Sequence, residues 1–392
     1  MSVWQYLFPI FDPDVKNWPV EARLLRWMTL FWLLVGLAVL FSASYALADS
    51  RFGNGLYYFT RQVIWVWVGL IVFNSLVRSP LQNLLKIAPW MMLLVLGLIL
   101  FTLVPGLGEN INGATRWIKL GPILLQPSEF MKPFLVLQGA AVFGGWYRLS
   151  IAQRFTWIGI FGLVLAAILL QPNLSTTALC GMTLWLIALG SGLPLAYMGG
   201  TALLGVTMAV VSVTFREYQR RRILSFMNPW EDPRGDGYQL VQSLLAIGSG
   251  GPTGTGYGLS QQKLFYLPFP DTDFIFAVFS EEFGFIGGIL LLLMLLIYGT
   301  LALRVTILCR HRVKRLVALG SMVVLIGQAL LNMGVATGSL PTTGLPFPLF
   351  SYGGSSSLAS LFLAGLLIRV AREDNETENV PKTRKRPRNL TA

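Results

Sequence analysis

The chain has 392 residues, of which 54% are hydrophobic and only 12% are charged. Soluble globular proteins carry about a quarter of charged residues, so this composition excludes that class and indicates a membrane protein. The formal net charge of +12 would fit nucleic-acid binding. The excess lies mostly in short loops and the tail, however, where membrane topology and anionic lipid headgroups explain it better.

Apolar runs of about twenty residues, long enough to cross a hydrocarbon core of about 30 Å, recur along the whole chain. We therefore predict an all-α polytopic membrane protein with ten transmembrane helices. The predicted spans are 27–48, 62–77, 86–104, 130–146, 155–170, 174–191, 194–214, 274–303, 316–337 and 353–371. The predicted domains are a cytoplasmic N-terminal segment (1–26), a ten-span membrane domain (27–372) and a disordered basic cytoplasmic tail (373–392).

Basic residues set the predicted orientation. They precede the first span, flank the second-to-third and fourth-to-fifth connections, fill the eighth-to-ninth loop and end the tail. Short cytoplasmic loops are enriched in Lys and Arg, so this side is the cytoplasm and both termini lie there. Ala46, Leu47 and Ala48 resemble a signal-peptidase site. Because cleavage would leave nine spans, we expect an uncleaved anchor.

Two long polar loops fall on the other side, at about 105–129 and, between spans seven and eight, at about 215–272. Loops of this length with little regular structure are usually functional. Their cations break the positive-inside pattern and predict an anionic ligand, because the Arg fork suits phosphate. For Arg220 to Arg222, the alternative is binding to lipid headgroups at the interface. The cations are Arg116, Lys119, Arg216, Arg220, Arg221, Arg222, Arg234 and Lys263.

Four acidic residues lie at the mouth and in the upper part of the eighth predicted span: Asp271, Asp273, Glu281 and Glu282. Asp273 lies at the predicted interface, and we expect it to take part in chemistry. Glu281 and Glu282 lie deeper in the apolar span, where a charge must face the bundle interior, a cavity or a cation. We predict that these two form a structural polar clamp between helices. The glycine-rich segment 246–260 lacks the ending of a nucleotide P-loop and reads as a flexible loop.

The last outer loop, 338–357, combines Pro, Gly and small hydroxyl residues. It reads as a re-entrant, cavity-lining segment, since irregular backbone at membrane depth must be covered by protein or water. Close helix packing through small residues is an alternative, and both can hold. The chain's only histidine, His311, lies in a predicted cytoplasmic loop. A Ser-His-Asp triad or a histidine zinc site on the outer side is therefore excluded, which leaves a carboxylate with cations.

With these residues in view, the sequence resembles the SEDS family, the FtsW/RodA-type peptidoglycan polymerases, over about residues 23–372. Two motifs look closer to the FtsW branch than to the RodA branch: "GYQLVQSLLAIGSGG" and "LPTTG…SYGGSS". The matching segments are Asn112 to Lys132, Gln171 to Thr177, Asn228 to Gly251, Gly258 to Phe285 and Asn332 to Ser356.

The resemblance implies glycosyl transfer on the outer face of the bacterial plasma membrane. Its substrates would be lipid II and a growing glycan on undecaprenyl diphosphate. Its expected partners are a class B penicillin-binding protein and the division machinery. The family's essential Asp falls on Asp273, and its Arg-Trp pair on Arg116 and Trp117. Phe269 and Asp271 replace the usual Glu and His, and Asn173 replaces an Asp, so those roles do not carry over.

The resulting hypothesis is a lipid II polymerase that builds cell wall in division, with a lipid II flippase or a non-catalytic scaffold as rivals. The family implies no certain cofactor, and a divalent cation stays open. Asp273 is the predicted catalytic base. The predicted substrate-binding residues are Arg116, Trp117, Lys119, Arg220, Arg221, Arg222, Lys263, Ser351 and Ser355.

Overall fold

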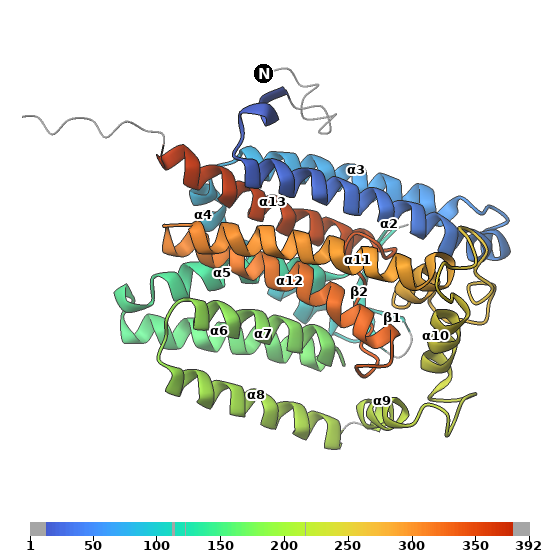
Figure 1. Cartoon of the computed structure of the whole chain (residues 1–392). Coiled ribbons are helices and arrows are strands. Elements are labelled where there is room, and N and C mark those ends of the chain that lie inside the picture. Colours follow the sequence, from blue (N-terminus) through green and yellow to red (C-terminus); the bar gives the residue numbers. More distant parts are fainter. Residues whose placement is uncertain (1–12, 112–113, 122, 216, 379–392) are drawn as a thin grey trace, which may run out of the picture.

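The computed structural model describes residues 13–111, 114–121, 123–215 and 217–378. Long helices lie side by side in a bundle, and short helices and a small sheet gather at one of its ends (Figure 1). The motif residues Asn112 and Gly113, the predicted cation Arg216 and most of the predicted tail lie outside the described residues.

A helix is found at each of the ten predicted spans. Eight of these helices are long and apolar enough to cross a membrane, which makes the chain an integral membrane protein. The other two are α5 and α7, which has 17 residues. The ten helices are α2 (Val20–Phe52), α3 (Tyr57–Arg78), α4 (Leu81–Thr102), α5 (Pro127–Gly144), α6 (Ile151–Leu170), α7 (Leu174–Gly190), α8 (Leu195–Phe215), α11 (Ile275–Leu308), α12 (Arg312–Ala336) and α13 (Gly354–Glu378).

Helices α2 and α13 extend beyond the spans predicted for them. Helix α2 begins at Val20, inside the segment expected to precede the first span. Helix α13 continues to Glu378, past the predicted end of the last span at 371. In both cases the polar end of the helix extends beyond the apolar stretch, which is the only part that hydropathy detects.

The two long loops contain more regular structure than predicted. The first folds into a three-stranded antiparallel sheet of β1 (Glu109–Ile111), β2 (Ala114–Leu120) and β3 (Ile123–Leu125), in that order. The second contains α9 (Glu217–Met227) and α10 (Tyr238–Ser249). Short 3-10 turns lie at Pro13–Asn17 and Trp146–Arg148. The fold is therefore mostly helical rather than all-α.

Helices α12 and α13 form the centre of the bundle. Helix α13 packs against α3, α5 and α12, and α12 also packs against α5, α7 and α11. Within their apolar windows, 83% of α13 and 61% of α12 are buried, against 11% of α8. Helix α8 packs against α7 and α9 at the edge of the bundle (Figure 1). Its exposed apolar side chains are those expected of a helix that faces lipid.

Helix α11 is interrupted at Gly284, whose backbone has φ 66° and ψ −165°. The segment 251–256 satisfies the peptide groups that the break frees. Thr255 and Gly256 donate from their backbone N–H groups to the Glu281 and Glu282 carbonyls, and Phe285 and Ile286 donate to the Gly251 and Pro252 carbonyls. The glycine-rich segment is thus a fitted partner of the broken helix rather than a flexible loop.

Replacing Gly284 with Ala is expected to lower the free energy of unfolding by about 1–3 kcal/mol from backbone strain alone. The added Cβ would also lie 2.3 Å from the backbone nitrogen of Gly254. Gly288→Ala is the matched control, because it lies in the same helix with nothing within 4 Å of its Cβ position. Thermal unfolding in detergent measures both variants, and equal stability of the two would contradict the role given to the break.

Candidate active site

Asp273 lies on a turn whose backbone is held at three consecutive carbonyls. The Tyr352 backbone N–H donates to the Asp271 carbonyl at 2.8 Å. The Ser351 hydroxyl donates to the Thr272 carbonyl at 2.5 Å, and the Asn332 side-chain amide donates to the Asp273 carbonyl at 2.8 Å. These donors come from α12 and the loop after it, so the position of Asp273 relative to the bundle core is fixed.

The Asp273 side chain is half-buried, and the charges of two guanidinium groups, those of Arg222 and Arg116, act on it. Burial raises the pKa of its carboxyl group, and the charges of Arg222 and Arg116 offset only part of that rise. A raised pKa makes the carboxylate a better proton acceptor.

Arg116 reaches the site from the middle strand of the sheet. Its Nε donates to the Gln171 carbonyl at 2.9 Å, and its Nη2 donates to the Pro172 carbonyl at 2.5 Å. The break at Pro172, between α6 and α7, therefore provides the acceptors that orient this guanidinium. Asn173, where the family has an Asp, caps α7: its Oδ1 accepts from the Thr176 backbone N–H at 3.3 Å.

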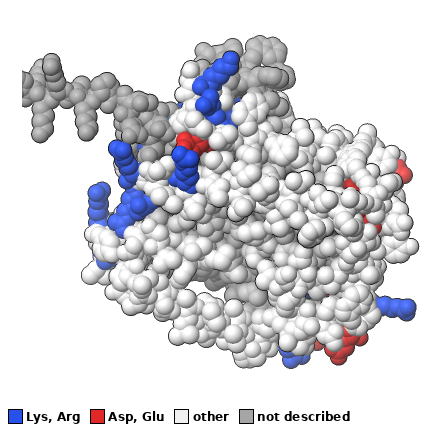
Figure 2. Space-filling view, viewed as in Figure 1, with Lys and Arg blue, Asp and Glu red and all other residues white. Residues whose placement is uncertain are grey.

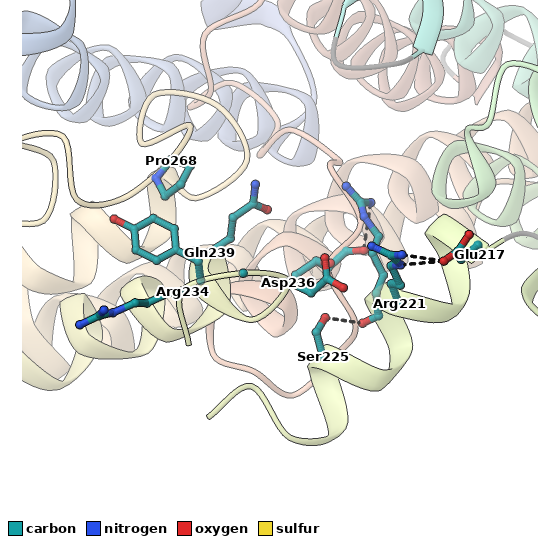
Figure 3. A pocket seen from close by; sticks show the side chains of 11 residues that line it. Glu217, Arg221, Ser225, Arg234, Asp236, Gln239 and Pro268 are labelled. Carbon is teal, nitrogen blue, oxygen red and sulfur yellow. Dashed lines mark hydrogen bonds and ion pairs between the residues drawn. The ribbon is translucent and has the colours of Figure 1, made fainter. Parts of the chain in front are cut away.

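Arg222, on α9, is the other cation whose charge acts on Asp273. Its Nη1 donates to the Thr342 carbonyl at 3.2 Å. Arg222 and Thr342 also line a cavity of about 600 Å³ beside the site. Figure 3 shows Arg221, Arg234, Asp236 and Gln239 around this cavity. The full lining is Glu217, Arg221, Arg222, Ser225, Arg234, Gly235, Asp236, Tyr238, Gln239, Pro268 and Thr342. Asp273 does not line it, so the two features adjoin through Arg222.

The other described cations of the outer loops either form ion pairs with acidic residues or are exposed to solvent. Lys119 pairs with Glu109 across β1 and β2, with 3.6 Å between Nζ and Oε1, and its side chain is 61% exposed. Arg221 forms an ion pair with Glu217 at 2.6 Å. Arg220 is exposed on α9, and Trp117 is half-buried in β2. Of the predicted cations that the structure describes, Arg116 and Arg222 are the two whose charges act on the Asp273 carboxyl group.

Lys263, Glu281 and Glu282 form a buried clamp away from the Asp273 carboxylate. The Lys263 Nζ lies 2.7 Å from Glu282 Oε1 and also 2.7 Å from the Ser42 hydroxyl of α2. Glu281 accepts from the Ser260 hydroxyl and from the Gln261 and Gln262 backbone N–H groups. The two glutamates thus hold residues 260–263, which precede the turn that carries Asp273, against α11 and α2.

Ser351 and Ser355 hold backbone in place. Besides its bond to the Thr272 carbonyl, Ser351 Oγ accepts from the Phe347 N–H at 2.8 Å, and Ser355 Oγ accepts from the Gln126 N–H at 3.0 Å. The last loop is therefore well packed: Ser351 is 2% exposed and Ser355 is 8% exposed.

Sequence reasoning missed Asn332 and Gln328, two amides one helical turn apart inside an apolar span. Asn332 also donates to the Leu345 carbonyl at 2.8 Å. Gln328 donates to the Pro346 carbonyl and accepts from the buried Lys132 at 2.8 Å. Lys132 in turn pairs with Glu129 at 2.6 Å. The i, i+4 spacing of amides in an otherwise apolar helix was the available signal, because it places both on one face.

Asp271, which stands where the family has a His, is 5% exposed. Burial raises the pKa of its carboxyl from the ordinary 3.8 to about 6, and the Asp273 charge adds to the rise. Above that pH the folded protein holds a carboxylate that would be better solvated in the unfolded chain. Burying the charge therefore costs stability above pH 6, whereas the neutral acid below pH 4 carries no such cost.

Asp271→Asn is accordingly expected to raise the free energy of unfolding by about 3 kcal/mol at pH 7.5, at 1.36 kcal/mol per unit of pKa difference. The gain should shrink through pH 6 and vanish near pH 4. Thermal unfolding of both proteins in detergent across this range measures it. A gain that is the same at pH 4 and pH 7.5 would contradict the assignment.

A divalent cation remains a prediction. Among the described residues, no three His, Cys, Asp or Glu side chains gather in a way that could hold a metal ion.

Comparisons with known proteins agree on one family. The family model described as "Cell cycle protein" (FtsW, RodA, SpoVE) matches residues 22–376. The chain is 60% identical to the probable peptidoglycan glycosyltransferase FtsW of Synechocystis sp., over 97% of this chain and 96% of that protein. It is 50% identical to the putative peptidoglycan glycosyltransferase FtsW of Mesostigma viride, over 95% and 89% of the two chains.

Solved structures share the fold. One belongs to work described as "Structural coordination of polymerization and crosslinking by a peptidoglycan synthase complex", with a TM-score of 0.71, 29% identity and coverage of 89% of this chain and 98% of that chain. The rod shape determining protein RodA of Thermus thermophilus has a TM-score of 0.66 and 26% identity, with 89% and 96% of the chains covered. The family match spans nearly every helix described above, and the chain therefore belongs to the FtsW/RodA/SpoVE family of cell cycle proteins.

Proposed function

We propose that this chain is a peptidoglycan glycosyltransferase that polymerises lipid II. One observation carries the proposal: the charges of Arg116 and Arg222, which lie on separate loops, both act on the half-buried carboxylate of Asp273. The relatives at 60% and 50% identity are named as such glycosyltransferases. A carboxylate with paired cations suits transfer of a sugar from a diphosphate donor.

In the proposed reaction, the acceptor hydroxyl of lipid II attacks the anomeric carbon of the growing glycan. The new glycosidic C–O bond forms as the bond from that carbon to the phosphate oxygen breaks. Asp273 takes the proton of the attacking hydroxyl, and undecaprenyl diphosphate leaves with the electron pair. A diphosphate is a good leaving group, so the second carboxylate that glycosidases use as general acid is dispensable.

Arg116 and Arg222 stabilise the diphosphate as its charge develops. In the adjoining cavity, Arg221 is paired with Glu217, and Arg234 extends the positive surface along which a phosphate group approaches. Lys119, Arg220 and Trp117 lie on the same loops and guide the lipid-linked substrates toward it. Lys263, Ser351 and Ser355 support the site through the buried contacts described above rather than by touching substrate.

The proposed topology has ten crossings of a bacterial plasma membrane, with α5 and α7 completing the eight long apolar helices. The basic loops then lie in the cytoplasm with both termini, and α9, α10, the sheet and Asp273 lie at the extracytoplasmic end. Several of the visible Lys and Arg side chains gather at the opposite end of the bundle (Figure 2), as the positive-inside rule requires of a cytoplasmic face.

The proposed partner is a class B penicillin-binding protein that cross-links the new strand, within the division machinery. The structural neighbour described as a peptidoglycan synthase complex that coordinates polymerisation and crosslinking supports such an assembly.

Reconstitution of the purified chain in proteoliposomes with lipid II, with and without the cognate transpeptidase, tests the proposal. Glycan strands are the expected product. Lipid II that becomes accessible to reagents on the far leaflet without strand formation would identify a flippase instead. Neither product, with the transpeptidase still bound, would identify a scaffold.

A further inference from the structure

A second pocket lies at the opposite end of the bundle from Asp273. It is formed where α5 ends and where the chain turns from α11 into α12, and its volume is about 290 Å³. Its lining residues are Gly144, Gly145, Tyr147, Arg148, Arg310, His311, Arg312 and Val313. No catalytic or substrate-binding role proposed above uses these residues.

The pocket is strongly cationic. Three of its eight lining residues are arginines, and none is acidic. Because the lining itself contains no carboxylate, its three guanidinium groups make this part of the surface positive, and an anionic ligand would be attracted to it.

Contacts within the protein hold the walls of this pocket in place. Arg312 donates to the Ser191 carbonyl, and its guanidinium lies 5.7 Å from the centre of the Tyr147 ring. Close packing brings the two walls together, because a Cβ on Gly144 would lie 2.8 Å from a Val313 methyl group. A guanidinium held in this way loses little conformational freedom when it binds a ligand.

The surface beside the pocket is apolar. Tyr147 is 59% exposed, and Ile151 and Phe155 of the first turns of α6 are each 70% exposed. In a membrane protein such side chains face lipid, so the cationic pocket opens at the level where headgroups meet acyl chains. A phosphate group is the anion found there, and basic pockets between membrane helices bind anionic headgroups.

We propose that this pocket binds a phosphate group, carried either by an anionic phospholipid of the adjacent leaflet or by a small soluble phosphate compound. Arg148, Arg310 and Arg312 supply the charge-assisted hydrogen bonds. The site is separate from the polymerisation chemistry, and its occupation does not depend on the proposed function.

The experiment measures binding of dioctanoyl phosphatidylglycerol, dioctanoyl phosphatidylcholine and inorganic phosphate to the purified full chain in detergent. The test variant is Arg148→Gln with Arg310→Gln. The control is Lys16→Gln with Lys86→Gln, which removes the same charge from exposed residues outside the pocket. The test variant is expected to weaken phosphatidylglycerol binding by at least about tenfold, and the control to leave it unchanged.

The choice of ligands distinguishes a phospholipid headgroup from a soluble phosphate compound. Binding of phosphatidylglycerol without binding of inorganic phosphate identifies a lipid headgroup, whereas inorganic phosphate that binds and competes identifies a soluble phosphate compound. Equal affinity for phosphatidylglycerol and phosphatidylcholine without phosphate binding would overturn the proposal, as would equal losses in both variants. If the glutamine variant does not fold, the variant Arg148→Lys with Arg310→Lys, which keeps the charge, is measured in its place. It should bind more weakly than the wild type, because lysine lacks the forked donor pair.

Discussion

Asp273→Asn is expected to reduce glycan synthesis from lipid II by about 10²–10⁴-fold, the contribution of a general base. The amide has nearly the same shape as the carboxylate but cannot accept the proton of the acceptor hydroxyl. The backbone bonds that fix the turn, from Tyr352, Ser351 and Asn332, do not involve the side chain and should persist. The variant should therefore insert, purify and unfold like the wild type.

Asp271→Asn is the matched control, because it makes the same change two residues away and leaves Asp273 intact. It should retain glycan synthesis while showing the stability gain described above. The measurement is glycan strand formation in proteoliposomes, with the thermal unfolding of each variant recorded alongside. Wild-type-like strands from the Asp273 variant would end its assignment as the base. A loss accompanied by a large fall in the unfolding temperature would show a structural role instead.

The long helices were predictable because apolar runs of fixed length are what a bilayer demands. Each predicted span coincides with a helix, and the break at Pro172 falls between α6 and α7 as expected. Hydropathy does not show where a helix continues into water, which is why the prediction missed the first turns of α2 and the last turns of α13. It also does not decide whether α5 and α7 cross the membrane.

The short elements of the outer loops were not predictable in the same way. Helix α9 carries three successive arginines and has a polar composition, so it gives no span signal. The strands around Arg116 are three to seven residues long and become a sheet only by pairing with one another. Their stability comes from contacts between loops, which a single segment of sequence does not display.

The choice among the candidate cations also needed the fold. Arg220, Arg221 and Arg222 are adjacent in sequence, but successive residues of a helix point about 100° apart. Of these three, Arg222 is the one whose charge acts on the Asp273 carboxyl group, while Arg221 pairs with Glu217. The charge of Lys263 predicted a substrate-binding role. Its actual partners, Glu282 on α11 and Ser42 on α2, are distant in sequence and become its neighbours only in the folded chain, so the sequence did not reveal them.

Lys263→Met should lower the free energy of unfolding by about 3–5 kcal/mol, because it leaves a buried carboxylate without its cation. The Glu282 side chain is fully buried, its Oε2 has no partner among the described residues, and the Lys263 side chain is 6% exposed. Lys119→Met is the matched control. Its ion pair with Glu109 is exposed, so its loss should cost at most about 1 kcal/mol.

The double variant Lys263→Met with Glu282→Gln decides between the structural and the substrate-binding role of Lys263. A neutral amide no longer needs a cation and still accepts from the Ser42 hydroxyl, so the double variant should recover most of the lost stability. Thermal unfolding in detergent of the wild type, both single variants and the double variant completes the cycle. If Lys263 instead bound the diphosphate, Lys263→Met would unfold like the wild type and raise the KM for lipid II, and the Glu282 change would restore nothing. If the double variant recovers both stability and glycan synthesis, the role of Lys263 is to form the buried ion pair with Glu282 that supports the turn carrying Asp273.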